Sequence, residues 1–262
     1  MLGSGTSVGV PTIGCPCAVC RSADARDNRL RPSVLLRYNG RAVLIDTTPD
    51  LRIQALRAGM TQLDAILYTH AHADHILGLD DVRPFNYGRC EPIPIYGSQE
   101  TIDIIRGTFR YIFEPRPSQS SRPKIVARIL DGAVFDLFGL AIQPVPVFHG
   151  HARIYGFRFG PVAYLTDHSE IPPESLERLR GLEVLFLDAL RHAPHPTHST
   201  VERSLATVGQ LQPKLAYFTH ICHDLPHAET ERQLPPGVKL AYDGLEVEFC
   251  VNLNSGGPGG SL

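Results

Sequence analysis

The sequence predicts an α/β fold of the α+β type, in which two mixed β-sheets pack face to face and helices cover their outer sides. Short apolar runs recur between Gly, Pro and Asp residues, and they alternate with stretches of helical spacing. Several neighbouring runs are separated only by short turns, so they pair as hairpins and a purely parallel sheet is excluded. The length of 262 residues, 43% of them hydrophobic, is sufficient for one large sandwich.

The first half of the chain contains a predicted hairpin, because Asn39-Gly40 favours a two-residue turn between two apolar runs. Leu51, Ile53 and Leu56 follow with helical spacing, and that segment ends at a glycine, a common residue just after a helix. The predicted elements of this half are strands at 33–37 and 42–45, a helix at 50–59, a strand at 65–68 and a helix at 100–109.

The second half of the chain repeats this alternation of strands and helices. Pro144 and Pro146 lie inside one apolar run, and because proline cannot donate to a neighbouring strand, we place this strand at a sheet edge. Several runs end directly before a His or Asp residue. The predicted elements of this half are strands at 141–147, 154–159, 162–165, 184–187, 215–218, 238–242 and 245–251, with a helix at 200–211.

We expect residues 1–253 to form a single domain, since no linker divides them. A Cys-rich loop lies at 14–31, and the proline-rich stretch at 113–124 is predicted to be a surface loop. Residues 254–262 are rich in glycine and are predicted to form a disordered tail. Only Met1 and Leu2 precede a glycine-rich loop, so the first strand is short and the sequence leaves open whether Met1 is the true start.

The charge and hydropathy of the chain exclude several classes of protein. The net charge is −2 at pH 7, so a basic surface for nucleic acid is not expected. No apolar run is long enough to span a membrane, and the N-terminus lacks the charged and apolar regions of a secretory signal. We therefore expect a cytoplasmic protein that acts on a small molecule. Whether it forms a homodimer stays open.

Histidine and aspartate residues concentrate in one short run, His70-Ala71-His72-Ala73-Asp74-His75, which directly follows a predicted strand. Alternate residues of an extended stretch point the same way, so His70 and His72 could bind one metal ion. Asp74 and His75 lie beyond the turn and could bind a second. Imidazole suits Zn²⁺, Fe²⁺ or Mn²⁺, and an added carboxylate extends the choice toward Mn²⁺. The run therefore predicts a two-metal site on a rigid strand end.

This run resembles the His-x-His-x-Asp-His signature of the metallo-β-lactamase superfamily, and the resemblance extends over nearly the whole chain. It implies a four-layer αββα sandwich that holds two divalent ions, zinc or manganese, at one edge. Asp46 matches an early aspartate that supports the site without touching the metal, although it could equally cap a turn. The implied ligands are His70, His72 and His149 for one ion, Asp74, His75 and His220 for the other, and Asp167 as the bridge.

A second cluster consists of Cys15, Cys17 and Cys20, three thiols with the spacing C-x-C-x-x-C. Structural zinc takes four ligands in a tetrahedral arrangement, so a fourth ligand must come from elsewhere. The pattern resembles the PhnP phosphodiesterases, which pair such a cluster with a histidine just after the last active-site ligand. His223 matches that position, three residues after His220. The resemblance therefore implies one structural zinc ion that ties the Cys-rich loop to the active site.

The segment from Arg191 to His198 contains three histidines before a predicted helix. In the PhnP family a histidine at such a position is the proposed general acid, and His198 matches it best, with His195 as the alternative. A metal-bridging hydroxide would then attack phosphorus while an imidazolium protonates the leaving group. We also assign Asp74 a catalytic role beside its role as a ligand. The Gly3–Ser7 loop lacks the Gly-Lys-Ser/Thr ending of a nucleotide-binding loop and is not a nucleotide site.

These patterns predict a dinuclear metal-dependent phosphodiesterase that hydrolyses a small or cyclic phosphodiester. A ribonuclease Z-like nuclease has a similar core, but it normally adds a long flexible arm and a basic surface. A thioester or lactone hydrolase of the same fold is a further alternative, and it would not need the cysteine cluster. A non-catalytic carrier resembling the PqqB proteins is disfavoured, because all seven active-site ligand positions are filled.

Overall fold

The computed structural model describes residues 1–114, 121–251 and 253. The expected tail at 254–262 and part of the expected loop at 113–124 lie outside these residues. The described residues form two mixed β-sheets with helices on their outer sides, the predicted αββα sandwich. Among the described residues, no helix combines the length and the apolar character that crossing a membrane requires.

The smaller sheet has five strands in the order β1-β2-β3-β4-β5. The first two form the predicted antiparallel hairpin, and all other neighbours are parallel. The strands are β1 (Val34–Tyr38), β2 (Arg41–Ile45), β3 (Ala65–Leu67), β4 (Ile93–Gly97) and β5 (Ile125–Ile129).

The larger sheet has seven strands in the order β12-β11-β10-β9-β8-β7-β6. Strands β6 to β9 are antiparallel neighbours, whereas β9 to β12 are parallel. The strands are β6 (Phe135–Leu137), β7 (Leu140–His149), β8 (Ala152–Phe159), β9 (Val162–Leu165), β10 (Val184–Asp188), β11 (Leu215–Thr219) and β12 (Val238–Leu240).

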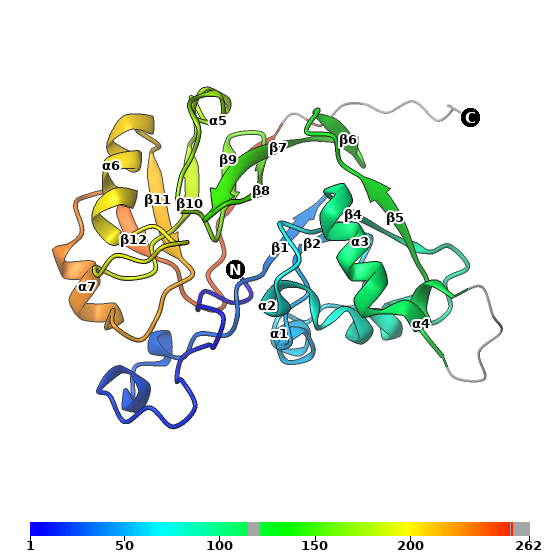
Figure 1. The fold of residues 1–262 in the computed structure, drawn as a ribbon, viewed down its shortest axis with the longest axis horizontal. Coiled ribbons are helices and arrows are strands. Elements are labelled where there is room, and N and C mark those ends of the chain that lie inside the picture. The colour runs from blue at the N-terminus through cyan, green and yellow to red at the C-terminus, as the bar shows by residue number, and fades with distance from the viewer. Residues whose placement is uncertain (115–120, 252, 254–262) are drawn as a thin grey trace.

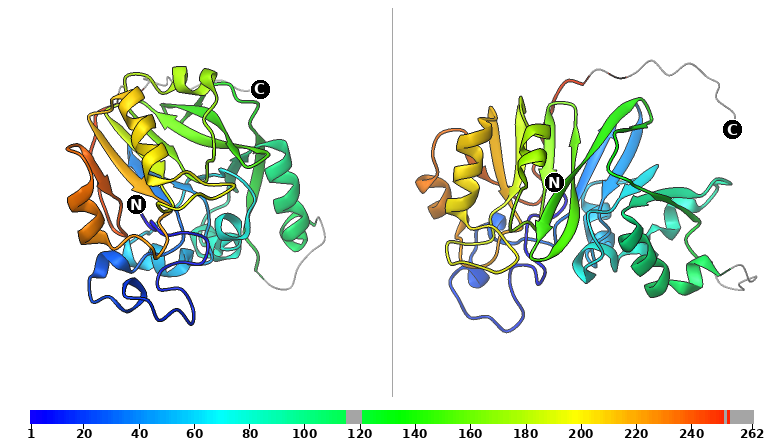
Figure 2. Two further views of the ribbon diagram at one scale, coloured as in Figure 1. Left: turned by 60° about the vertical axis from the view of Figure 1, so that its left-hand side comes forward. Right: turned by 45° about the horizontal axis from the view of Figure 1, so that its top comes forward.

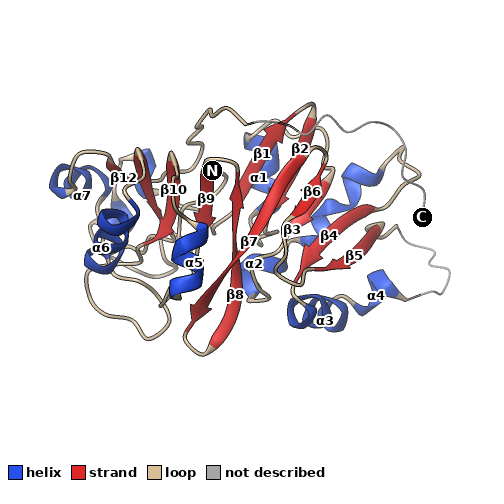
Figure 3. Ribbon diagram, turned by 90° about the horizontal axis from the view of Figure 1, so that it is seen from above, coloured by secondary structure: helices blue, strands red, loops and turns tan. Residues whose placement is uncertain are grey.

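The helices divide between the two outer faces of the sandwich. Figure 1 shows α5, α6 and α7 beside the seven-stranded sheet, and α1, α3 and α4 beside the five-stranded sheet. The 45° turned view and the view from above show the same separation (Figures 2 and 3). The α-helices are α1 (Leu51–Arg57), α2 (Ala73–Ile76), α3 (Gln99–Thr108), α4 (Arg110–Phe113), α5 (Pro173–Arg178), α6 (Val201–Leu211) and α7 (His227–Gln233), and the 3₁₀ helices are η1 (Val19–Arg21), η2 (Ala25–Asp27) and η3 (Leu79–Asn86).

Alternating side chains of the central strands build three apolar layers. In β10, Phe186 faces the other sheet, whereas Leu185 and Leu187 face the layer shared with α6. In β2, Val43 packs between the sheets and Leu44 packs toward α1 and α3. The period of two residues in a strand therefore produces strands that are buried on both faces. This explains why these segments are continuous apolar runs in the sequence.

Pro144 and Pro146 lie on an open stretch of β7, as their lack of an amide proton predicts. Strand β6 pairs with only the first three residues of β7, Leu140 to Ile142. Beyond them, Arg178 donates to the carbonyl of Pro144 at 3.0 Å and Ser175 to that of Pro146 at 2.6 Å. Side chains thus replace the missing strand.

One expectation needs correction. Residues 245–251 form no strand, although Leu245, Val247, Phe249 and Val251 pack against the core between the sheets. Their alternating apolar pattern is satisfied by packing alone, without hydrogen bonds to a neighbouring strand. Separately, strands β4, β5 and β6 and helices α4, α5 and α7 were not predicted. These elements are short, or they carry proline and polar residues that weaken the apolar pattern.

The carboxyl ends of the parallel strands lie at one edge of the sandwich. Polar side chains at or just beyond the ends of β2, β3, β7, β9, β10 and β11 lie close together. The fold thus gathers at this edge residues that are far apart in the sequence.

Candidate metal centres

The run from His70 to His75 begins just after β3 and ends in α2. The amide of Thr69 donates to Asp46 Oδ1 at 2.9 Å, which ties this segment to the end of β2. His72 is extended and is the residue before the helix, while Asp74 and His75 lie inside α2. A strand end and a short helix therefore direct the four side chains, as the sequence predicts.

The first group consists of His70, His72 and His149, and one ring nitrogen of each lies within 4.8 Å of the others. His149 is the last residue of β7, and its Nδ1 lies 2.8 Å from the carbonyl oxygen of Thr197. This contact places the proton on Nδ1 and leaves Nε2 as the free lone pair. His72 is exposed, whereas the other two are buried, so His72 marks the open side of the site.

The second group consists of Asp74, His75, Asp167 and His220, all of them buried, with ligand atoms within 4.8 Å of one another. His75 Nε2 lies 3.2 Å from Asp74 Oδ2. His220 Nε2 lies 3.8 Å from the same oxygen. The structure therefore brings these four side chains together from three places: helix α2, the segment after β9 and the end of β11.

Asp167 lies between the two groups. Its Oδ2 atom is 3.4 Å from His75 Nε2 and 3.2 Å from His220 Nε2. It is also 3.9 Å from Nε2 of His70, which belongs to the first group. Thr166 donates to the other oxygen, Oδ1, at 2.5 Å. One carboxylate oxygen thus faces ligand atoms of both groups, which is the arrangement that a bridging ligand requires.

Three residues at this edge adopt left-handed backbone conformations that are uncommon outside glycine. The φ angles are 63° at Asp46, 52° at Asp167 and 57° at His220. Each follows the end of a strand, and the sharp change of chain direction turns its side chain into the site. Such conformations cost free energy and cluster at functional sites.

The chemistry of the second group fits a divalent cation. Burial alone would raise the pKa values of Asp74 and Asp167, but neighbouring histidines hold both well below their usual range. Two buried carboxylates are therefore ionised and need positive charge. Several buried atoms have no hydrogen-bond partner among the described residues; these are His70 Nε2, Asp74 Oδ2, His75 Nε2 and His220 Nε2. Metal coordination would satisfy all of them.

Asp46 holds the ring of His75 and does not merely cap a turn. Its Oδ2 atom lies 2.8 Å from His75 Nδ1 and also accepts a hydrogen bond from Thr69 Oγ1 at 2.8 Å. Both Asp46 and His75 are fully buried. Such a contact fixes the proton on Nδ1 and directs the lone pair of Nε2 toward a metal ion.

His198 reaches the same site, and its partner Asp188 was not predicted from the sequence. His198 Nδ1 lies 2.8 Å from Asp188 Oδ2, and the His198 ring lies 4.8 Å from the His149 ring, centroid to centroid. Asp188 is the last residue of β10, fully buried. Its position at a strand end is the same signal that selected Asp167, and that signal could have identified it.

His195, the alternative acid, lies farther from the metal-binding groups. Its ring centroid is 5.0 Å from that of His198, and its Nδ1 accepts a hydrogen bond from the amide of Thr197 at 3.3 Å. Burial and the neighbouring His198 lower its pKa. His195 is half-buried, whereas His198 is buried and contacts the rings of two candidate ligands.

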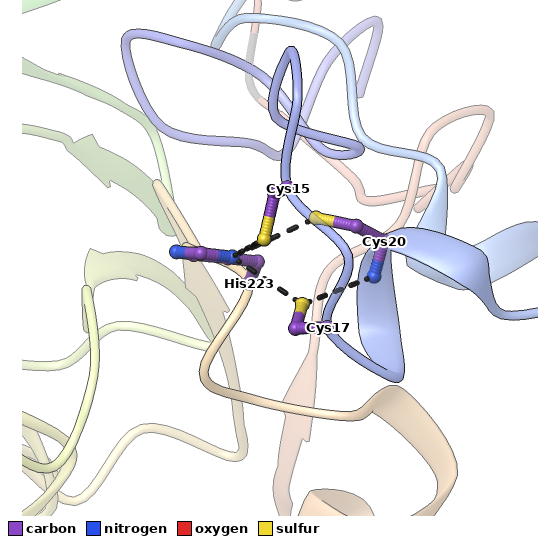
Figure 4. Close-up of side chains that lie close together, drawn as sticks. All are labelled: Cys15, Cys17, Cys20 and His223. Atoms are coloured by element: carbon purple, nitrogen blue, oxygen red, sulfur yellow. Dashed lines mark hydrogen bonds between the residues drawn. The ribbon is translucent and has the colours of Figure 1, made fainter.

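The cysteine cluster is assembled as the sequence predicts (Figure 4). The distances from His223 Nδ1 to the sulfur atoms are 3.2 Å for Cys15, 3.4 Å for Cys17 and 3.6 Å for Cys20. The amide of Cys20 donates to Cys17 Sγ at 3.4 Å and helps to lower the pKa of Cys17 to about 6. Three sulfurs and one imidazole nitrogen converge, a donor set that suits tetrahedral zinc.

A buried guanidinium also joins the Cys-rich loop to the segment of His223. Arg29 is 1% exposed and donates to the carbonyls of Cys222 at 2.8 Å and Leu225 at 2.6 Å. It also forms an ion pair of 2.8 Å with Asp27. These contacts hold both sides of the cysteine cluster, and no sequence pattern identifies them.

Known proteins match this arrangement over most of the chain. The beta-lactamase superfamily domain matches residues 41–221. A crystal structure described as a new diphosphatase from the PhnP family is 55% identical, with a TM-score of 0.91, and the match covers 97% of this chain and 98% of that one. This chain belongs to the PhnP family of the metallo-β-lactamase superfamily. The family resemblance expected from the sequence is confirmed.

Other relatives of this PhnP-family chain have different names and lengths. An octanoyltransferase of Porphyromonas gingivalis is 39% identical over 250 residues, or 94% of this chain. The chain spans only 50% of that protein's length. A ribonuclease Z of Mycobacterium marinum is 28% identical over 224 residues, which cover 74% of this chain and 80% of the nuclease.

Proposed function

We propose that this chain is a two-metal hydrolase that cleaves small phosphodiesters, including cyclic ones, or the P–O–P bridge of a disubstituted diphosphate. The observation that carries this proposal is the position of Asp167. Its Oδ2 atom lies within 3.9 Å of ligand nitrogens from both groups, so one carboxylate can bridge two ions. The two substrate types share a phosphorus atom with two non-bridging oxygens, which two adjacent cations can clamp.

The residues divide into two ligand sets and one bridge. His70, His72 and His149 would hold one ion, and Asp74, His75 and His220 would hold the other. Zinc and manganese both suit this mixture of imidazole and carboxylate. When bound, two such ions would supply a nucleophilic water at neutral pH and neutralise charge on the phosphate. We assign Asp74 a further role in orienting the attacking water, because it is a buried ionised carboxylate in the second ligand group.

His198 is the proposed general acid. Asp188 accepts a hydrogen bond from His198 Nδ1, so His198 Nε2 is the nitrogen left to protonate the leaving oxygen. The His198 ring lies within 5 Å, centroid to centroid, of the His149 and His220 rings, which belong to different ligand sets. It therefore lies beside both candidate metal positions.

The cysteine cluster would hold one structural zinc ion. His223 lies three residues after His220, so a zinc ion bound by Cys15, Cys17, Cys20 and His223 would anchor the Cys-rich loop next to the active site. This role needs no access to substrate. It is consistent with the contacts of Arg29, which hold the same two segments.

The likeness to a PhnP-family diphosphatase supports a small phosphorus-containing substrate. The likeness to ribonuclease Z keeps nuclease activity as the alternative. The net charge of −2 favours the small substrate, because nucleic-acid enzymes neutralise many phosphates with basic side chains.

A substrate panel tests this proposal. The purified chain would be assayed with added Mn²⁺ or Zn²⁺ on bis(p-nitrophenyl) phosphate, cyclic nucleotides, a dinucleoside diphosphate, a precursor tRNA, a thioester and a lactone. We expect turnover of the small phosphodiesters or the diphosphate that a chelator abolishes. Thioester or lactone hydrolysis without phosphodiester turnover would contradict the proposal, as would a preference for the precursor tRNA.

A further inference from the structure

The two carboxylate oxygens of Asp188 differ in their hydrogen bonding. Oδ2 accepts hydrogen bonds from His198 Nδ1 at 2.8 Å and from the amide of His168 at 3.0 Å. Oδ1 is buried and has no hydrogen-bond partner among the described residues. Because a buried carboxylate oxygen without a donor is costly, this atom needs a partner in the working protein.

One candidate donor belongs to His220; the Nδ1 atom of His168, whose amide already donates to Asp188, is another buried nitrogen without a partner among the described residues. Asp188 pairs with Thr219 in the register of β10 and β11, so the residue after Thr219 lies next to it. The rings of His198 and His220 are stacked, with centroids 4.6 Å apart and planes inclined by 14°. A nitrogen of each ring lies within 4.8 Å of one Asp188 oxygen. Asp188 thus faces both imidazoles.

The tautomer of His220 explains why its second nitrogen needs an acceptor. Nε2 faces the carboxylates of Asp167 and Asp74, at 3.2 and 3.8 Å, so it is the nitrogen available to a metal ion. A neutral imidazole that binds metal through Nε2 carries its proton on Nδ1. His220 Nδ1 is buried and has no partner among the described residues. His220 thus offers a donor without a partner on the residue that follows the strand neighbour of Asp188.

We propose that Asp188 is a positioning residue for two groups at once: its Oδ2 atom orients His198, and its Oδ1 atom accepts a hydrogen bond from His220 Nδ1 when His220 binds metal. This inference rests on the proposed two-metal function. A carboxylate behind a ligating histidine fixes the ring and strengthens its lone pair, and loss of such a partner typically weakens metal binding about 10–100-fold. One side chain would thereby link the general acid to the second metal position.

Thr219 is the competing acceptor. Its Oγ1 atom is also buried without a partner among the described residues. The carboxylate is favoured because a charged acceptor forms a stronger hydrogen bond than a hydroxyl does. Thr219→Val removes the hydroxyl and keeps the shape of the side chain, so it is a matched control.

Metal affinity distinguishes the two roles proposed for Asp188, which are to position the ligand His220 and to position the acid His198. The full-length Asp188→Ala, His198→Ala and Thr219→Val variants would be loaded with Zn²⁺ or Mn²⁺ and titrated with a competing chelator, with metal content measured by elemental analysis. We expect Asp188→Ala to bind the second active-site ion about 10–100-fold more weakly. We expect His198→Ala and Thr219→Val to retain wild-type affinity. Excess metal should then restore part of the turnover of Asp188→Ala on bis(p-nitrophenyl) phosphate. It should not restore the turnover that His198→Ala has lost.

Two results would overturn the inference. Asp188→Ala with wild-type metal affinity would mean that Asp188 acts through His198 alone, and weakened affinity in Thr219→Val alone would identify Thr219 as the acceptor. If Asp188→Ala does not fold, Asp188→Asn replaces it. Its single amide oxygen can serve only one ring, so it should lose either metal affinity or acid function, and retention of both would contradict the proposal. Failure of the wild-type chain to bind metal at all would instead reject the proposed function.

Discussion

The Nδ1 nitrogen of His75 lies 2.8 Å from Oδ2 of Asp46, and neither side chain is exposed to solvent. The other oxygen of Asp46 accepts a hydrogen bond from the amide of Thr69. The pair therefore connects the end of β2 to both ends of the run from His70 to His75. Its geometry fixes which nitrogen of His75 is free for a metal ion.

Asp46→Asn should weaken the second active-site metal position about 10–100-fold, because an amide cannot accept from both Thr69 and His75 as the carboxylate does. Chelator competition on the purified variant measures this change. Asp64→Asn is the control, since Asp64 is a buried carboxylate that contacts Arg41 and the amide of Ala42 instead. Unchanged metal affinity in Asp46→Asn would show that the pair has no role in the site.

His198→Ala should slow hydrolysis by about 10²–10⁴-fold when the leaving group is an alkoxide, which needs a proton, and by less when it is p-nitrophenolate. The measurement is kcat across a series of phosphodiesters with leaving groups of increasing pKa. His195→Ala is the control, because His195 is the alternative candidate and its ring packs against that of His198. A steep dependence on the leaving group in His195→Ala and not in His198→Ala would assign the acid to His195.

The thiol of Cys17 should titrate near pH 6 in metal-free protein. Hydrogen bonds that stabilise the thiolate, the largest effect coming from the amide of Cys20, lower the pKa of Cys17 from 9.0 to about 6. The folded state favours the thiolate, so this contribution is fully present above pH 9 and is lost as the pH falls through about 6. Ultraviolet absorbance of the thiolate during a pH titration, compared with Cys17→Ser, measures the step. A step near the ordinary thiol pKa would contradict this reading.

Arg29→Met should destabilise the fold by about 3–5 kcal/mol, because it leaves Asp27 buried without its cation and two carbonyls without their donor. Denaturant unfolding of the zinc-loaded protein measures the change. Arg26→Met is the matched control: its ion pair with Asp24 is partly exposed to solvent, so a loss of less than about 1 kcal/mol is expected. Equal stability of the two variants would show that Arg29 is not a structural link.

The sequence predicted the sandwich of two sheets for a physical reason, whereas the seven proposed ligand positions came from the resemblance to the superfamily. The central strands are buried on both faces, so they are continuous apolar runs, and residues such as His70 and Asp167 follow them directly. Convergence of strand ends then places these side chains together. The cysteine spacing selected Cys15, Cys17 and Cys20 without any knowledge of the loop that carries them.

Contacts between distant segments could not be predicted in the same way. The position of Asp188 at a strand end marks it as a candidate, but its contact with His198 depends on the fold. Arg29 lacks a local pattern, because its role depends on the packing of its guanidinium against the carbonyls of Cys222 and Leu225. Residues 245–251 were predicted to be a strand that the structure does not contain, because packing alone satisfies their alternating apolar pattern.

Metal stoichiometry tests the central claim most directly. Elemental analysis of the purified chain, saturated with Zn²⁺ and dialysed, should give about three ions per chain, which corresponds to the two active-site ligand sets and the cysteine cluster. Asp167→Ala should reduce the count toward one, because the remaining ion is held by Cys15, Cys17, Cys20 and His223. A wild-type count of one, or a count that does not respond to Asp167→Ala, would contradict a two-metal site bridged by Asp167.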